Sequence, residues 1–344
     1  MPSFIRKVLI GTASALALGA LVGVGTEAVI RSRVAHEHPA PGRLVDIGGR
    51  QMQIDCRGTG APTVVFESGL DLLGSTSWAA VHDSIASTTR ACAYSRAGIL
   101  WSDRAPKPFT ADGVATDLRA TLSHAGETVP VVLVGHSIGG VYALQYTKRF
   151  GADVAGLVLV DASHPDQLRQ MEAATGKSMA PTAGPLTVAA SLARTGLVRL
   201  LAPDLNQPNA PAASRDAPGA YVPASLPAGV NELKAVPATL AAAESSRSLG
   251  ERPLVVLTAA QPSSAQQLKE MALTAEQGDR LLAVWLRLQT DEATWSTNSR
   301  QEILKDASHY IQFDRPDAVI RAVRHVVGAV RQSAAGSREG LTPP

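Results

Sequence analysis

Residues 131–140 read VVLVGHSIGG, and this stretch decides the fold. Residues 131–134 form an uninterrupted apolar run rich in β-branched side chains, which is typical of a strand buried on both faces of a parallel sheet. Residues 141–150 carry apolar positions at helical spacing and a basic end, so they predict a helix. Ser137 therefore lies in a G-x-S-x-G sequence, at a turn from strand to helix.

A serine at such a turn is typical of a nucleophile elbow. Gly135 and Gly139 flank Ser137 two residues away on either side, where the strand and helix backbones pass too close for a Cβ atom. The N-terminus of the following helix favours negative charge, which suits an oxyanion. The motif indicates a nucleophilic serine, and the alternative is a serine in an ordinary glycine-rich turn.

The remaining chain predicts an α/β architecture that opens on a hairpin. Residues 43–47 and 51–56 flank a Gly-Gly pair and predict a β-hairpin. Short apolar strands then alternate with helices, which implies a mostly parallel sheet with right-handed crossovers. Residues 164–252 are rich in Ala, Pro and Ser, and they predict helical pieces, such as 186–201 and 230–246, separated by Pro-rich turns. This segment is too long for a connection within a sheet, so we expect an inserted helical cap.

These patterns divide the 344 residues into a core that is interrupted by the cap. The expected segments, in order, are a signal anchor or signal peptide (1–30), a tether (31–42), the first part of the core (43–163), the helical cap (164–252), the second part of the core (253–331) and a disordered tail (332–344).

The N-terminal segment predicts contact with a membrane. Residues 8–26 carry no charge, and Arg6 and Lys7 precede them. This length is close to that of a bilayer span and somewhat long for the apolar core of a signal peptide. The cations in front would hold the N-terminus inside, with the rest of the chain outside. We expect a protein that is anchored in the cell membrane, or one that is secreted if the segment is cleaved.

Composition narrows the classes of partner. Hydrophobic residues make up 45% of the chain and charged residues 18%, and the net charge is +2. A clustered basic face, which is usual in nucleic-acid binding, is not evident in the sequence, so we expect no nucleic-acid partner. The sequence contains no dinucleotide fingerprint and no spacing typical of metal ligands, so we expect neither a cofactor nor a metal. A small molecule is the expected partner.

Five stretches give the chain a family resemblance. From about residue 42 to residue 330 it resembles the α/β-hydrolase superfamily, in the serine-hydrolase branch, and specifically a group of bacterial hydrolases that are often membrane-anchored. The resemblance implies eight strands in the order 1-2-4-3-5-6-7-8, a cap after the sixth strand, and a triad in the chain order serine, acid, histidine. The stretches are VVFESG (64–69), RACAYSRAG (90–98), VVLVGHSIGG (131–140), LVLVDASHPD (157–166) and ASHYIQFDRPDAVIRAV (307–323).

The resemblance implies the roles of the triad residues. Ser137 is the expected nucleophile, and it needs a base, which His309 supplies from the loop after the last strand. Asp161 directly ends the sixth strand, where a carboxylate could accept the imidazole N–H and fix its tautomer. Many relatives place the acid after the seventh strand instead. The alternative acids are therefore Glu270, Glu276 and Asp279.

Two further expectations follow from the resemblance. The oxyanion donors would be the backbone N–H groups of Ile138, just after the nucleophile, and Leu70, after Gly69. The second and fourth strands would be neighbours, so Cys56 and Cys92 can meet. An even number of cysteines in an exported protein indicates a disulfide, and we expect one between them.

The expected function is a serine hydrolase that acts through an acyl-enzyme, on carboxylic esters of small or apolar substrates. The same triad supports thioester, amide or carbon–carbon hydrolysis, acyl transfer and haloperoxidation. An epoxide hydrolase or dehalogenase would normally carry Asp in place of Ser137. A binding protein that retains the fold is the other alternative. One departure stands out, because relatives usually read Tyr-Asp-Arg where this chain has Ser95 before Arg96, which leaves the arginine without its usual carboxylate.

Overall fold

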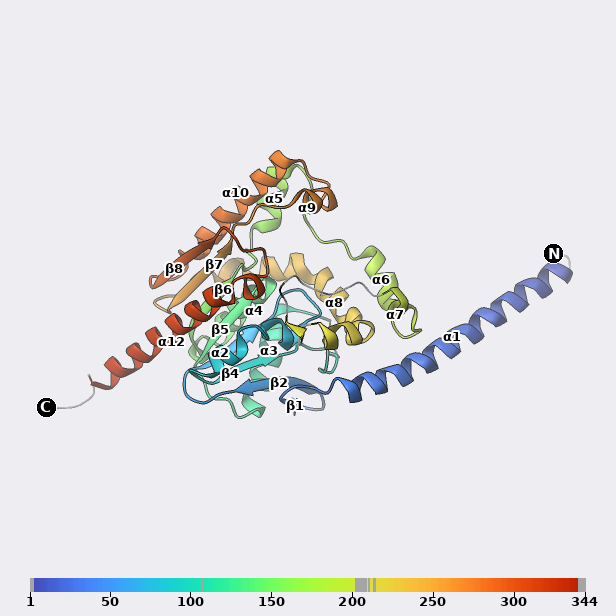
Figure 1. The fold of residues 1–344 in the computed structure, drawn as a ribbon, viewed down its shortest axis with the longest axis horizontal. Helices are drawn as coiled ribbons and strands as arrows, with labels where there is room; N and C mark the ends of the chain where they lie inside the picture. Colours follow the sequence, from blue (N-terminus) through green and yellow to red (C-terminus); the bar gives the residue numbers. More distant parts are fainter. Residues whose placement is uncertain (1–2, 107, 202–208, 210, 213–214, 340–344) are drawn as a thin grey trace.

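The computed structural model describes residues 3–106, 108–201, 209, 211–212 and 215–339, and an eight-stranded sheet forms its centre (Figure 1). The strand order is β1-β2-β4-β3-β5-β6-β7-β8, which confirms the order implied by the resemblance. The β1–β2 and β2–β4 pairs are antiparallel, and the other pairs are parallel. The strands are β1 (Arg43–Asp46), β2 (Gln51–Arg57), β3 (Thr63–Glu67), β4 (Ala91–Tyr94), β5 (Val131–His136), β6 (Val154–Val160), β7 (Leu254–Ala259) and β8 (Ser299–Leu304).

Helices cover both faces of the sheet, as the apolar run of β5 requires. Val131 and Leu133 point to one face, where they join a core cluster with α3 and α4. Val132 and Val134 point to the other face, where α2 and α12 cover them. This period of two within an all-apolar strand is the signature of a central parallel strand. The helices of the two layers are α2 (His82–Ala86), α3 (Ala111–His124), α4 (Ile138–Arg149) and α12 (Pro316–Glu339).

Within the described residues, the cap between β6 and β7 contains the α-helices α5 (Gln167–Thr175), α6 (Gly184–Ser191), α7 (Leu197–Leu201) and α8 (Asp216–Ala243). Further helices follow β7 and β8: α9 (Ala265–Glu270), α10 (Ala275–Glu292) and α11 (Ile311–Asp314). The single helix expected over 186–201 is two shorter ones. The expected turn just before residue 230 is wrong, because α8 already begins at Asp216 and runs unbroken through Pro223 and Pro227; most of the segment 202–214 lies outside the described residues.

Side chains from other elements explain why α8 tolerates its prolines. A proline has no N–H to give to the carbonyl four residues earlier. Pro227 therefore leaves the Pro223 carbonyl free, and Arg31 donates to it from Nη2 at 3.0 Å. The carbonyls of Ala220 and Ala224 likewise accept from arginine side chains. Three carbonyls of the first half of α8 thus bind arginine side chains, and one of them is the carbonyl that Pro227 frees; local propensity does not contain these long-range contacts.

The ends of the described chain are more helical than expected. Helix α1 (Ser3–Glu37) continues through most of the segment 31–42, which was predicted to be a tether. It is long and apolar enough to cross a membrane, by length and composition. Helix α12 extends to Glu339, so residues 332–339 of the expected disordered tail are helical; residues 340–344 lie outside the described chain.

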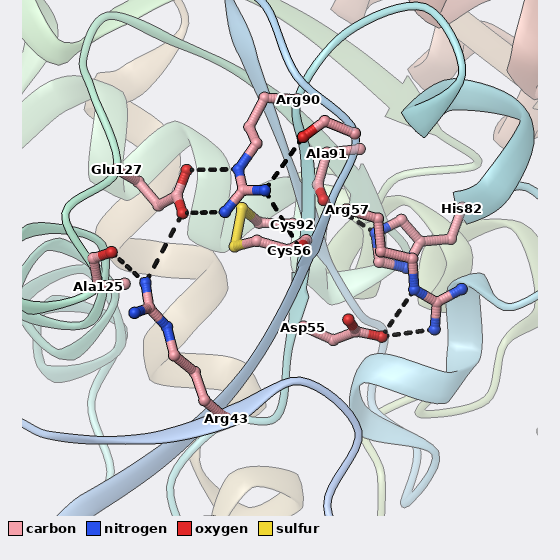
Figure 2. The surroundings of a disulfide bond; sticks show 11 residues. Arg43, Asp55, Cys56, Arg57, His82, Arg90, Ala91, Cys92, Ala125 and Glu127 are labelled. Atoms are coloured by element: carbon pink, nitrogen blue, oxygen red, sulfur yellow. Dashed lines mark hydrogen bonds and ion pairs between the residues drawn. A yellow bond between two sulfur atoms is a disulfide. The ribbon is translucent and has the colours of Figure 1, made fainter.

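Cys56 of β2 and Cys92 of β4 lie directly opposite each other and form a disulfide (Figure 2). Two ion pairs lie beside this bond: Arg90 pairs with Glu127 at 2.7 Å, and Arg57 pairs with Asp55 at 2.5 Å. The bond therefore links the antiparallel edge of the sheet to its parallel part.

Candidate active site

The strand-to-helix turn places Ser137 in a strained conformation. Its φ of 53° and ψ of −128° lie in a region that residues other than glycine rarely occupy. A Cβ on Gly135 would lie 2.6 Å from the Cα of Gly140, and one on Gly139 would lie 2.5 Å from the carbonyl oxygen of Glu67. Both glycines are required because backbone occupies the space of a side chain.

Asp161 and His309 form a short hydrogen bond. His309 Nδ1 lies 2.6 Å from Asp161 Oδ2. The other carboxylate oxygen, Oδ1, accepts from the Ala259 N–H and from Trp285 Nε1, both at 2.8 Å. Asp161 is buried at the end of β6 with a φ of 44°, whereas the His309 side chain is 45% exposed. The carboxylate is therefore fixed by three donors, while the imidazole stays open to solvent.

His136 connects the elbow to the loop that carries His309. Its Nε2 lies 2.8 Å from the His309 carbonyl oxygen, to which it donates, and the two rings are 4.7 Å apart. Burial holds the pKa of His136 well below its usual range, and the neighbouring His309 lowers it further. His136 is thus a neutral donor at neutral pH. Because it directly precedes Ser137, it holds the His309 loop against the elbow.

The loop after β3 passes directly beside the elbow. A Cβ on Gly69 would lie 3.2 Å from the Cβ of Ser137 and 2.8 Å from Nδ1 of His136. The peptide that joins Gly69 to Leu70 therefore lies next to the serine. Leu70 and Ile138 also pack in one apolar cluster. The structure thus brings both expected oxyanion residues to the same place.

Arg96 is the residue that holds this loop. It is only 3% exposed and lies among backbone and carboxylate oxygens. Its Nη1 donates to Glu67 Oε1 and to the Ser68 carbonyl, each at 2.7 Å. Its Nη2 donates to the Gly69 carbonyl at 2.6 Å and to Glu232 Oε1 at 2.7 Å. Since Glu232 belongs to α8, one guanidinium connects the loop after β3 to the cap.

Burial changes the ionisation of this network. It raises the pKa of Glu67 to about 7, although the positive charge of Arg96 opposes the shift. Burial also raises the pKa of Glu232, again against Arg96. Tyr94 donates to Glu67, and Tyr142 donates to Glu232 at 3.0 Å. Glu67 is therefore the member of this network whose pKa lies close to neutral pH. A cavity of about 650 Å³ borders Tyr94 and Arg96, and the Asp161–His309 pair does not line it.

The alternative acids lie elsewhere. Glu270 lies on α9, and Glu276 and Asp279 lie on α10. All three are exposed, whereas the carboxylate that His309 binds is that of Asp161. Sequence reasoning missed the supporting residues His136, Trp285 and Glu232. Arg96 offered a signal, because a buried guanidinium that lacks its usual neighbour must find another carboxylate.

One group of residues within the described chain has the spacing of metal ligands. It consists of Cys56, Cys92 and Glu127. The disulfide uses both sulfur atoms, and Arg90 pairs with the carboxylate. Thiolate ligation requires free sulfurs, so this group is a structural crosslink beside an ion pair.

Curated relatives match only part of the chain. An uncharacterised protein of Schizosaccharomyces pombe is 38% identical over 81 residues, which is 24% of this chain and 15% of that protein. The uncharacterised protein YbdG of Bacillus subtilis is 24% identical over 127 residues, 37% of this chain and 39% of that protein. The chain therefore spans well under half the length of these relatives.

Solved structures match more of the chain. A thermophilic esterase from Thermogutta terrifontis is 22% identical with a TM-score of 0.54, over 84% of this chain and 98% of that one. An epoxide hydrolase from Bacillus megaterium is 14% identical with a TM-score of 0.58, over 83% and 100%. At these identities the likeness establishes the fold. The model of the alpha/beta hydrolase family matches residues 55–322, which is more than half of the chain, and the protein therefore belongs to the alpha/beta hydrolase family.

Proposed function

We propose that the protein is a serine hydrolase that cleaves carboxylic esters of small or apolar substrates through an acyl-enzyme. Ser137 is the nucleophile, His309 the base and Asp161 the acid of the triad. The hydrogen bond of 2.6 Å between His309 and Asp161 is the observation that carries the proposal, and the strained elbow conformation of Ser137 supports it. Membership of the alpha/beta hydrolase family supports a hydrolytic reaction.

In the proposed reaction, His309 Nε2 takes the proton of the Ser137 hydroxyl as its oxygen attacks the ester carbonyl. Asp161 accepts the Nδ1 proton of His309 in a hydrogen bond and stabilises the imidazolium. The N–H groups of Ile138 and Leu70 donate to the oxyanion of the tetrahedral intermediate. The imidazolium protonates the leaving alkoxide, which leaves an acyl group on the serine. Water, deprotonated by His309, then releases the acid.

The nature of the nucleophile favours ester chemistry over epoxide opening. An epoxide hydrolase normally attacks with an aspartate, and this chain has Ser137 at that position of the elbow. The solved structures that share the fold include both enzyme classes, so the fold alone does not decide between them. A serine nucleophile forms an ester intermediate that water can hydrolyse with His309 as base.

A fluorophosphonate probe tests this function. We expect one covalent label per molecule, located on Ser137 by mass spectrometry. We also expect hydrolysis of p-nitrophenyl esters, lost in Ser137→Ala and kept in Ser123→Ala, a change at an exposed serine of α3. A folded protein that stays unlabelled and inactive would refute the proposal and favour a binding protein that retains the fold. A panel of esters of graded acyl length would then define the substrate.

We further propose that α1 anchors the protein in the cell membrane with the hydrolase domain outside. The helix is long and apolar enough for a span, and Arg6 and Lys7 precede its apolar run. A disulfide between Cys56 and Cys92 suits an oxidising compartment outside the cytosol. Cleavage of the segment, with secretion of the domain, is the competing outcome. Detergent extraction and immunoblotting of the full chain against a version cut after residue 37 distinguish the two.

A further inference from the structure

The cap binds helix α1 through a buried carboxylate. Glu27 of α1 is 1% exposed, although it directly follows the apolar run of residues 8–26. Arg199 of α7 donates to both of its oxygens, each at 3.0 Å, and Arg31 donates to Oε1 at 2.9 Å. A carboxylate is buried at such a boundary only when its charge is paired. The pairing shows that α1 and the cap fold together at this point.

Arg31 of α1 also binds two further segments of the cap. Its Nη2 donates to the carbonyl of Ala193, in the α6–α7 connection, at 3.1 Å, and to the carbonyl of Pro223, in α8, at 3.0 Å. The second bond replaces the one that Pro227 cannot make. An arginine of α1 therefore replaces one of the backbone hydrogen bonds that α8 lacks, so α1 is bound to the folded domain.

The α6–α7 turn touches the apolar part of α1 itself. A Cβ on Gly23 would lie 2.3 Å from the Thr195 carbonyl oxygen, so the two backbones are in contact. Gly23 lies one turn before Glu27, which is about 6 Å along the helix axis. If α1 spans the bilayer with its uncharged run in the hydrocarbon, Thr195 lies at the edge of the hydrocarbon, next to the lipid headgroups.

The helices on either side of this turn expose apolar side chains. Leu200 is the most exposed, at 81%. Single exposed apolar residues are ordinary on soluble proteins, but here five gather on α6, on α7 and at the residue that follows α6, next to the anchor. Figure 1 shows α6 and α7 on the flank of the molecule that faces α1. The five are Leu186, Val188, Leu192, Leu197 and Leu200.

One helix links this flank to the candidate site. In α8, the carbonyl of Pro223 accepts a hydrogen bond from Arg31 of the anchor, and Glu232 binds Arg96 beside the loop after β3. The two positions are nine residues apart, about 14 Å along the helix. The distance from the level of the headgroups to the loop beside Ser137 is therefore similar to the hydrocarbon thickness of one lipid monolayer, ~15 Å.

We propose that the outer face of α6 and α7 rests on the lipid bilayer, and that the enzyme takes membrane-dissolved acyl esters as substrates from that surface. The substrate class rests on the proposed hydrolase function, whereas the seating of the cap does not. We assign this face to the bilayer because its apolar side chains flank a turn that contacts α1 inside the apolar run of that helix. Lipid contact of the leucines and of Val188 removes their apolar surface from water.

Lipid quenching tests the seating directly. Full-length variants Leu200→Cys and Val188→Cys, labelled with the environment-sensitive dye NBD, are reconstituted in phosphatidylcholine–phosphatidylglycerol vesicles with or without spin-labelled lipid. Val129→Cys is the matched control, because it is 49% exposed and lies before β5, at the opposite edge of the sheet from the cap. We expect quenching at positions 188 and 200 and none at 129. Absence of quenching at both cap positions would overturn the proposal. Crosslinking between copies at position 200 without lipid quenching would assign the face to a second copy and also overturn it.

Activity tests the substrate class. The double variant Val188→Asp/Leu200→Asp is compared with Val129→Asp on two esters, a long-chain ester carried in the vesicles and a short, water-soluble p-nitrophenyl ester. We expect the cap variant to lose roughly ten-fold or more on the vesicle ester, since each lost apolar contact is worth a kcal/mol or more, and to keep its rate on the soluble one. Equal rates on the vesicle ester for both variants would overturn the substrate class. If neither ester is hydrolysed by the wild type, the proposed function fails, and the quenching result still decides the seating.

Discussion

The hydrogen bonds of Asp161 make Asp161→Asn a sharp test of the proposed triad. Oδ1 accepts two N–H groups, from Ala259 and Trp285, both at 2.8 Å. An amide NH2 in that place would face two donors, so the new amide must keep its oxygen there. Its NH2 then points at Nδ1 of His309, which has to carry its proton on Nε2 instead. An imidazole protonated at Nε2 cannot accept the proton of Ser137.

We expect kcat to fall about 10⁴-fold in Asp161→Asn, or about 5 kcal/mol of transition-state stabilisation, because a triad histidine held in the wrong tautomer loses about this much. The melting temperature should change little, since the amide has the shape of the carboxyl and keeps both donors. Initial rates of p-nitrophenyl butyrate hydrolysis and circular dichroism melts measure the two effects. Matched controls are Glu276→Gln and Asp279→Asn, at exposed carboxylates of α10, and both should keep near-normal rates.

Two results would contradict this reasoning. A folded Asp161→Asn protein that keeps more than roughly a tenth of the wild-type kcat would show that the tautomer of His309 does not limit the reaction. A large loss in Glu276→Gln or Asp279→Asn, with Asp161→Asn nearly active, would move the acid to α10. The second result would require a rearrangement of the loop after β7.

Three further predictions concern stability. Arg96→Met leaves the buried carboxylates of Glu67 and Glu232 without their cation and should lower the free energy of unfolding in urea by about 3–5 kcal/mol at pH 8. The loss should be smaller at pH 5, where the two carboxylates are protonated. A loss that does not depend on pH would contradict this. The pKa of Glu67 is raised from 4.5 to about 7 in the folded state, so the fold binds its proton more tightly than the unfolded chain does. Stability from this group is full below pH 4.5 and is lost as pH rises to 7, so the wild type should lose up to about 3 kcal/mol more than Glu67→Gln over that range, and parallel curves would refute the shift. Reduction of Cys56–Cys92, which are 36 residues apart in sequence, should lower the free energy of unfolding by about 4 kcal/mol, and a Cys56→Ala/Cys92→Ala protein of equal stability would exclude this.

The sequence predicts the centre of the fold well because that part depends on local pattern. The β5 run and the glycines around Ser137 specify a buried strand and a tight turn by sterics alone, and the strand order follows from the family resemblance. Asp161 and His309 were predicted from their positions at strand ends, and the structure places them in contact. Local pattern and resemblance together were sufficient because each of these residues follows a strand.

The sequence fails where the decisive contact is distant. Pro223 and Pro227 predict a turn by propensity, yet α8 is continuous because Arg31, far away in the chain, binds the freed carbonyl. Glu232 gives no local sign that it is a partner of Arg96, since it lies 136 positions later in a segment of low complexity. Residues 31–37 were predicted to be a tether because nothing nearby shows that their helix packs on the cap. Long-range contacts of charged side chains decide all three cases.

The disulfide between β2 and β4 also determines how the domain withstands a pull on its N-terminus. Traction on a tethered molecule first loads the contacts of α1 with the cap, and once these break it passes into β1, where hydrogen bonds of an antiparallel edge pair can be unzipped one after another. Cys56 is covalently fixed to Cys92, so the chain can be drawn out no further than residue 56. Shear flow or the drag of a cell surface can therefore strip the first hairpin strand, while the strands that carry the reactive groups stay in register.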